Sequence, residues 1–153
     1  MSEPETELDG QASVLADPKT KLVLLIEDDE GQRDLIKHLV GAEGFRVEMA
    51  ANGKEGLKQA QRLNPDLLLI DLMLPGIGGY ELVRELQASG LGEAPVIVLT
   101  AKSMAAKTIE MIKQEPNVKD FWEKPPSSAQ VTSIHSLLKT LPPLGGSAGP
   151  ESI

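Results

Sequence analysis

The stretch Leu67-Leu68-Leu69-Ile70-Asp71-Leu72-Met73-Leu74-Pro75-Gly76 places four apolar residues directly before one carboxylate and closes in a turn. A short unbroken apolar run bounded by turn residues is typical of a strand buried on both faces, as in a parallel sheet. Such a strand delivers the residue at its end to the carboxyl edge of the sheet, where ligands bind in open α/β folds. The pattern therefore predicts that Asp71 stands at a reactive edge, although Asp is also common at the start of an ordinary turn.

The bulk composition is that of an ordinary domain of 153 residues with a real core. No apolar run is long enough to span a bilayer, so we expect no membrane insertion. The formal net charge of −8 argues against nucleic acid as a direct partner, because phosphate binding relies on basic side chains. The chain has no cysteine, which excludes disulfides and thiolate metal sites. The N-terminus does not begin with a basic segment followed by an apolar one, so we expect a cytoplasmic protein.

Strands and amphipathic helices are predicted to alternate five times along the chain. Five repeats of strand and helix with right-handed crossovers favour an α/β fold, a doubly wound five-stranded parallel sheet with the flavodoxin-like strand order 2-1-3-4-5. The predicted strands cover 21–26, 46–50, 67–71, 95–99 and 118–123.

Two flanking segments are expected to lie outside this domain, which we place at 21–141. Residues 1–20 form a polar, acidic lead-in that has little to bury and is expected to be mobile. Within it only residues 14–16 are apolar enough to dock on the domain. Residues 142–153 are rich in Pro, Gly and Ser and are expected to form a flexible tail.

Four of the five predicted strands end beside a residue that can take part in chemistry. If the sheet is parallel, all of these residues lie at one edge, and they are Glu27, Asp28, Asp71, Thr100 and Lys124. Two like charges about 4 Å apart repel by about 4 kcal/mol near a protein surface, so crowded carboxylates need a counter-charge. Mg²⁺ is bound through one or two carboxylates and keeps waters for a phosphate, which makes it the predicted metal.

A carboxylate, a metal, a hydroxyl and an ammonium are the groups needed to move a phosphoryl group onto Asp71. The metal and Lys124 would neutralise the phosphoryl oxygens, and Thr100 would donate a hydrogen bond to one of them. Each residue alone also has an ordinary explanation. The acids at 27–30 suit a solvated helix start, Thr100 suits a helix cap, and Lys124 suits a surface position.

From about residue 21 to 140 the chain resembles the CheY-like receiver domains of two-component response regulators. The motifs that carry the resemblance are Leu24-Leu25-Ile26-Glu27-Asp28-Asp29, Leu69-Ile70-Asp71-Leu72-Met73-Leu74-Pro75-Gly76, Val98-Leu99-Thr100-Ala101 and Lys124-Pro125. The resemblance implies that Asp71 accepts a phosphoryl group from the phosphohistidine of a histidine kinase or a histidine phosphotransfer protein. It also implies a signalling receiver that assists its own phosphorylation and dephosphorylation rather than an enzyme.

The resemblance further implies a metal site. Asp28, Asp71 and the main-chain carbonyl of Met73 would bind Mg²⁺, and Glu27 would act through a metal-bound water.

A switch follows from the same resemblance. Thr100 and Lys124 would contact the phosphoryl group, and Phe121 would swing inward when the Thr100 hydroxyl moves. The Lys124–Pro125 peptide bond is expected to be cis. Because only about a dozen residues follow the predicted last helix, we expect a stand-alone receiver read by a separate protein partner, through the surface of helix 104–114, strand 118–123 and helix 127–141.

The sequence departs from the family pattern at Glu115-Pro116-Asn117-Val118-Lys119, which replaces the usual small residues before the last strand. Trp122 is expected to be partly exposed, and His38 and His135 are expected to be bystanders outside the edge. Two other functions remain open. One is a phosphorylation-independent interaction module of the same fold. The other is an aspartyl-phosphate phosphatase, which is disfavoured because Met73 occupies the place of its second aspartate.

Overall fold

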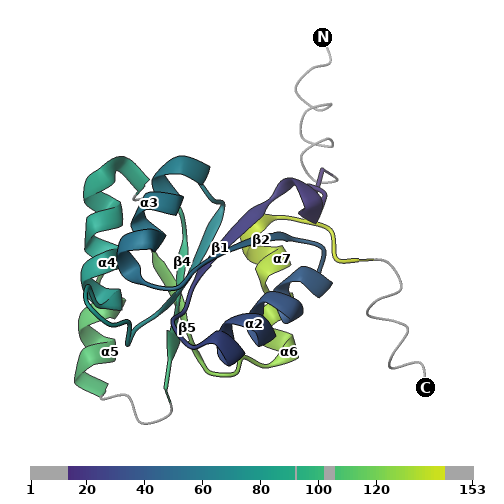
Figure 1. Ribbon diagram of the computed structural model, residues 1–153. Coiled ribbons are helices and arrows are strands. Elements are labelled where there is room, and N and C mark those ends of the chain that lie inside the picture. The colour runs from purple at the N-terminus through teal and green to yellow at the C-terminus, as the bar shows by residue number, and fades with distance from the viewer. Residues whose placement is uncertain (1–13, 92, 102–105, 144–153) are drawn as a thin grey trace.

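The computed structural model describes residues 14–91, 93–101 and 106–143, which form one parallel sheet with helices on both faces (Figure 1). The strand order is β2-β1-β3-β4-β5, as the sequence predicts. The strands are β1 (Leu22–Ile26), β2 (Arg46–Ala50), β3 (Leu67–Asp71), β4 (Val96–Thr100) and β5 (Val118–Glu123). The helices are η1 (Pro18–Thr20), α2 (Glu30–Ala42), α3 (Gly53–Leu63), α4 (Gly79–Leu86), η2 (Gln87–Leu91), α5 (Ala106–Lys113), α6 (Ser128–Thr132) and α7 (Ile134–Leu138).

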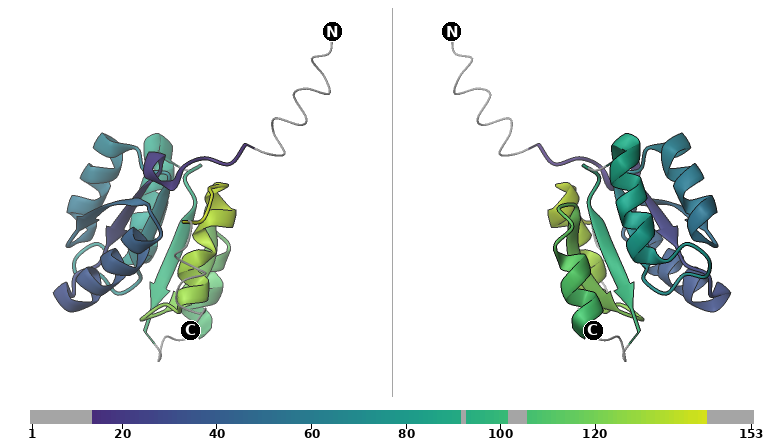
Figure 2. Two further views of the ribbon diagram at one scale, coloured as in Figure 1. Left: turned by 90° about the vertical axis from the view of Figure 1, so that its right-hand side faces the viewer. Right: turned by 90° about the vertical axis from the view of Figure 1, so that its left-hand side faces the viewer.

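The core lies in two layers, one on each face of the sheet. Side chains of successive strand residues point to opposite faces, so β1 sends Leu24 and Ile26 to one layer and Val23 and Leu25 to the other. Helices α3, α4 and α5 cover the first face and α2, α6 and α7 cover the second, and the two views of Figure 2 look onto these faces. The central strands are thus buried on both sides, which explains their unbroken apolar runs.

The register places the strand ends side by side at the carboxyl edge. Ile26 pairs with Ile70, and Thr100 pairs with Glu123. Between β4 and β5 the register shifts, so that Val96 pairs with Val118 but Ile97 pairs with Asp120. This bulge leaves Lys119, inside β5, without a register partner. A slip of one residue would otherwise turn every following side chain of the strand to the opposite face.

Trp122 corrects one expectation from the sequence. Its side chain is fully buried, with 0% exposure, in the layer under α2, α6 and α7. The indole Nε1 donates to Asp120 Oδ2 at 3.1 Å, so the polar end of the ring is satisfied within the same strand. The expectation of partial exposure was wrong because helices α6 and α7 cover this face of β5.

Two predicted helices differ from their expected bounds. The helix expected at 104–114 is observed as α5, and residues 104 and 105 lie outside the described part of the chain. The last helix is divided at Ser133 into α6 and α7. The Ser133 hydroxyl donates to the Gln130 carbonyl at 2.6 Å, a type of bond that competes with helix propagation and bends helices.

The residues before β1 are attached to the end of the domain. Ala16 pairs with Thr140 in a parallel bridge, in which the Ala16 amide donates to the Lys139 carbonyl and the Leu141 amide donates to the Ala16 carbonyl. Residues 16–20, which the sequence places in an acidic lead-in, therefore pack on the domain at the amino edge of the sheet, beside α7 (Figure 1).

The Thr140 side chain contacts the imidazole of His135. His135 Nδ1 lies 2.6 Å from Thr140 Oγ1, and His135 Nε2 lies 2.8 Å from Glu43 Oε1. The imidazole also stacks on the Phe45 ring, with centroids 4.7 Å apart.

None of the helices in the described part of the chain has the length and apolar character that a bilayer-spanning segment needs.

Candidate functional site

Three carboxylates converge at the carboxyl edge of the sheet. Because Ile26 and Ile70 are register partners, the next residues along the two strands, Glu27 and Asp71, leave the sheet side by side. One oxygen atom from each of Glu27, Asp28 and Asp71 lies within 4.8 Å of the other two. Glu27 and Asp71 are buried, whereas Asp28 is exposed. The prediction that these acids meet at one edge is therefore confirmed.

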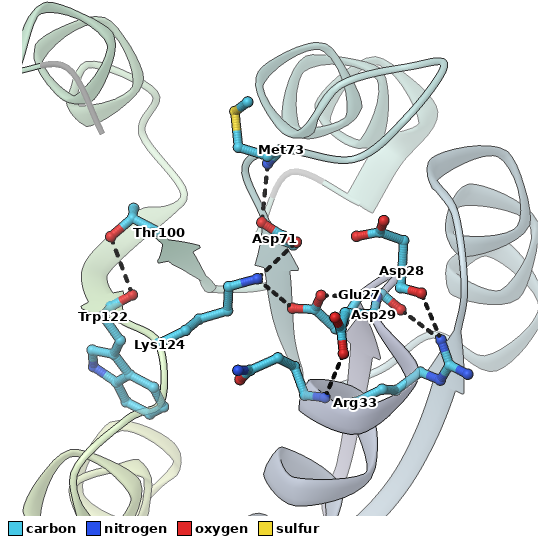
Figure 3. Close-up of polar contacts among 10 residues, drawn as sticks. Glu27, Asp28, Asp29, Arg33, Asp71, Met73, Thr100, Trp122 and Lys124 are labelled. Atoms are coloured by element: carbon cyan, nitrogen blue, oxygen red, sulfur yellow. Dashed lines mark hydrogen bonds and ion pairs between the residues drawn. The ribbon is translucent and has the colours of Figure 1, made fainter. Parts of the chain in front are cut away.

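Lys124 supplies a counter-charge to the two buried acids (Figure 3). Its Nζ atom lies 3.0 Å from Glu27 Oε1 and 3.0 Å from Asp71 Oδ2. The Lys124 amide donates to the Thr100 carbonyl at 2.9 Å, which fixes the lysine directly beyond the end of β5. The Lys124–Pro125 peptide bond is cis, as the family resemblance implies.

Burial and ion pairing act in opposite directions on the charged groups of the site. Burial raises the pKa of Glu27, although the hydrogen bonds from Lys124 and from the Asp29 amide work against this rise. For Lys124, burial would lower the pKa, but its hydrogen bonds to Glu27 and Asp71 outweigh burial, so that the pKa is raised. The lysine therefore keeps its charge at neutral pH because both acids face it.

The donor set of this edge fits a hard divalent cation. Carboxylate oxygens are the ligands that Mg²⁺ prefers, and three of them lie close enough to share one ion. The exposed side chain of Asp28 leaves the cluster open to solvent, as a metal that retains waters for a phosphate requires. The donor set of Glu27, Asp28 and Asp71 therefore suits such an ion.

The loop after β3 binds the Asp71 carboxylate oxygen that does not contact Lys124. The Met73 amide donates to Asp71 Oδ1 at 3.0 Å, and the Met73 side chain is 64% exposed. The loop then folds back closely, because a Cβ atom on Gly79 would lie 2.6 Å from the Asp71 carbonyl oxygen and 2.7 Å from Leu72 Cα. Only glycine fits this position without a shift of the backbone that carries Asp71. The Met73 carbonyl as a metal ligand stays a prediction.

Across residues 14–91, 93–101 and 106–143, Thr100 and Phe121 form no hydrogen bond with the three acids. The Thr100 hydroxyl donates to the Trp122 carbonyl at 3.4 Å, and Figure 3 shows it directed at this carbonyl rather than at Asp71. A distance of 3.4 Å is long for such a bond, which makes it a weak one. Phe121 is half-buried and packs on the core layer under α3, α4 and α5.

One residue of the site was missed by the sequence reasoning. Arg33, on the first turn of α2, donates from Nη1 to the main-chain carbonyl oxygens of Glu27 and Asp28. Side chains on a helix tilt toward its N-terminus, so a long basic residue one turn after the cap Asp29 reaches back to the preceding loop. That spacing was the signal that could have identified it.

The comparisons with known proteins agree with this architecture. The chain matches the response regulator receiver domain model over residues 23–135. It is 30% identical over 118 residues to the sensory transduction protein RegX3 of Mycolicibacterium smegmatis, covering 76% of this chain and 50% of that protein. It is 41% identical over 81 residues to the transcriptional regulatory protein AfsQ1 of Streptomyces coelicolor, covering 53% of this chain and 35% of that protein. The chain thus spans about half the length, or less, of these curated relatives.

A solved structure with the same architecture is the receiver domain of the sensor histidine kinase PA1611 from Pseudomonas aeruginosa, which has a magnesium ion coordinated in its active site cleft. The TM-score is 0.68 at 28% sequence identity, covering 77% of this chain and 96% of that chain. Sheet order, acidic edge and the match over residues 23–135 lead to one conclusion. The chain belongs to the response regulator receiver domain family of two-component systems.

Proposed function

We propose that Asp71 accepts a phosphoryl group from the phosphohistidine of a histidine kinase or a histidine phosphotransfer protein, with Mg²⁺ as cofactor. The observation that supports this most strongly is the cluster of Glu27, Asp28 and Asp71 within 4.8 Å, with Lys124 on two of the three acids. This set combines an acceptor, a metal-binding group and a fixed positive charge at an open edge of the sheet.

The chain's own residues would hold the metal and the acceptor. Asp28, Asp71 and the Met73 carbonyl are the proposed ligands of Mg²⁺, with Glu27 acting through a metal-bound water. When bound, Mg²⁺ supplies positive charge that offsets the repulsion among the acids and the negative charge of the phosphoryl oxygens. The magnesium ion in the related Pseudomonas aeruginosa receiver structure supports this assignment.

Transfer onto Asp71 exchanges one bond to phosphorus for another. A carboxylate oxygen of Asp71 forms a bond to phosphorus while the bond to the donor imidazole nitrogen breaks, and the electron pair of that bond stays on the nitrogen. A proton already carried by the other ring nitrogen of the donor lets the imidazole leave as a neutral group. The attacking carboxylate needs no general base. Lys124, already 3.0 Å from Asp71 Oδ2, would pair with a phosphoryl oxygen as a point charge, and it would keep its bond to Glu27.

The signal would leave the site through Thr100 and Phe121. A phosphoryl oxygen beside β4 is a stronger, charged acceptor for the Thr100 hydroxyl than the Trp122 carbonyl, which it contacts at 3.4 Å. Movement of Thr100 would let Phe121 turn inward and change the surface of α5, β5, α6 and α7. A separate protein that binds this altered surface would be the downstream partner. The net charge of −8 speaks against direct contact with nucleic acid.

The test is phosphoryl uptake from acetyl phosphate with Mg²⁺, followed by the mass of the intact protein. We expect the wild type to gain one phosphoryl group and Asp71→Asn to gain none. Asp34→Asn is the matched control, because Asp34 is an exposed acid on α2, and it should gain the group like the wild type. No uptake by the wild type would instead favour the phosphorylation-independent module, and sustained hydrolysis of a generic phosphomonoester would favour the phosphatase.

A further inference from the structure

Arg33 contacts the acidic loop from the side opposite Lys124. Its Nη1 atom lies 2.9 Å from the Glu27 carbonyl oxygen and 3.4 Å from the Asp28 carbonyl oxygen (Figure 3). Both contacts go to main-chain oxygens rather than to carboxylates, and Arg33 is half-buried. The arginine therefore acts on the backbone that carries the acids and leaves the carboxylate oxygens available.

With the Arg33 contact, every polar group of Glu27 has a hydrogen-bond partner. The Glu27 amide donates to the Ala50 carbonyl at 3.1 Å, and its carboxylate accepts from Lys124 and from the Asp29 amide. Arg33 holds the one remaining polar group, the carbonyl. Of these three groups only the carbonyl belongs to the peptide that joins Glu27 to Asp28, so the Arg33 contact is the one that restrains the plane of this peptide.

Asp28 depends on this plane more than Glu27 does. Its side chain is exposed, and across residues 14–91, 93–101 and 106–143 no hydrogen-bond donor contacts its carboxylate. The direction of the Asp28 side chain is therefore set by its backbone. Arg33 restrains that backbone mainly through its 2.9 Å bond to the Glu27 carbonyl, since its 3.4 Å contact with the Asp28 carbonyl is long. A metal ligand on a mobile backbone binds more weakly, and loss of the groups that orient ligands typically costs 10–100-fold in metal affinity.

We propose that Arg33 is a positioning residue that orients Glu27 and Asp28 for a divalent cation. The inference rests on the proposed function, because it assumes that Mg²⁺ binds to these acids. The proposal predicts the direction in which Mg²⁺ affinity changes when Arg33 is removed. A guanidinium that acted only through its charge would repel a nearby cation, and its removal would tighten Mg²⁺ binding. A positioning arginine does the opposite, and its removal weakens Mg²⁺ binding.

The experiment is a calorimetric titration of Mg²⁺ into the wild type, Arg33→Ala, Arg33→Lys and Arg62→Ala. We expect Arg33→Ala to raise the dissociation constant about tenfold. Arg33→Lys should fall between it and the wild type, because lysine keeps the charge and one donor but loses the planar fork. Arg62 lies on α3, is exposed, and bonds the side chain of Gln59, so Arg62→Ala should bind like the wild type.

A second readout separates positioning from general damage to the fold. The rate of phosphoryl uptake from acetyl phosphate should return close to the wild-type rate at saturating Mg²⁺ in both Arg33 variants. The Mg²⁺ concentration for half-maximal rate should shift as the dissociation constant does. If Arg33→Ala is poorly folded, the Mg²⁺ affinity and the uptake rate of Arg33→Lys are compared with those of the wild type instead.

Unchanged or tighter Mg²⁺ binding in the Arg33 variants, beside a wild type that binds Mg²⁺ and accepts phosphoryl groups, would overturn this inference alone. A wild type that does not bind Mg²⁺ would overturn the proposed function, and the inference with it.

Discussion

Lys124 Nζ lies 3.0 Å from Asp71 Oδ2, although 53 positions separate the two residues in the chain. The same nitrogen contacts Glu27 Oε1, so one ammonium serves two acids that are almost entirely removed from water. Lys124 thus supplies the positive charge in this cluster when no cation is bound to it.

Replacement of Lys124 with methionine should destabilise the domain when Mg²⁺ is removed with a chelator. Leaving a buried charge without its partner costs about 3 kcal/mol or more, and here two acids are left facing each other. The free energy of unfolding, measured with urea, should fall by about this amount, and added Mg²⁺ should restore more of it than in the wild type. Lys119→Met, at an exposed position of the same strand, should change it little. An equally stable Lys124→Met protein in chelator would contradict the structural role given to this lysine.

The raised pKa of Glu27, which burial causes, predicts a pH dependence of stability without Mg²⁺. The folded state binds this proton more tightly than the unfolded chain does. The contribution is therefore fully present below the ordinary carboxyl pKa of 4.5 and is lost as the pH rises through the raised pKa. Glu27→Gln, which carries no titrating proton, lacks this dependence.

The measurement is the free energy of unfolding of the wild type and Glu27→Gln from neutral pH down to 4.5. The wild type should gain stability relative to Glu27→Gln as the pH falls. Glu30→Gln, at an exposed position on the first turn of α2, keeps Glu27 and serves as the control, so it should gain stability relative to Glu27→Gln as the wild type does. A difference between the wild type and Glu27→Gln that stays constant or moves the other way would show that burial does not dominate at Glu27.

Gly79 and Gly78 offer a matched pair of alanine substitutions. A Cβ at Gly79 would meet the backbone of Asp71 and Leu72 at 2.6 and 2.7 Å, whereas a Cβ at Gly78 would meet nothing within 4 Å. Gly79→Ala should therefore lower the free energy of unfolding by about 1–3 kcal/mol and slow phosphoryl uptake, because the end of β3 must shift. Gly78→Ala should do neither. Equal behaviour of the two variants would mean that the loop yields without moving Asp71.

The place of the acids could be predicted from the sequence because it depends on strand ends alone. Each apolar run marks a buried strand, and parallel strands bring their carboxyl ends to one edge. Glu27 and Asp71 follow such runs directly, and the register of β1 and β3 places them side by side. Lys124 comes directly after the last strand, β5, and reaches the same edge. No knowledge of side-chain packing is needed for that step.

Trp122 and Ala16 could not be placed by the same reasoning. The strand that contains Trp122 mixes polar and apolar residues, and its exposure depends on whether α6 and α7 cover that face. Ala16 forms a single bridge to Thr140, far away in the chain, and one bridge leaves no periodic pattern. The Thr100 hydroxyl donates to the Trp122 carbonyl and not to Asp71. Residue spacing in the sequence does not indicate which of these two acceptors it contacts.

The bridge between Ala16 and Thr140 also has a practical use. It brings Ala16 and Thr140 together at one corner of the domain, at the opposite end of the strands from Asp71. A fluorophore or affinity tag added beyond this corner would leave the acidic cluster uncovered for a phosphodonor. For the same reason, a circular permutant that joins the two segments through a short linker needs to span only a small gap.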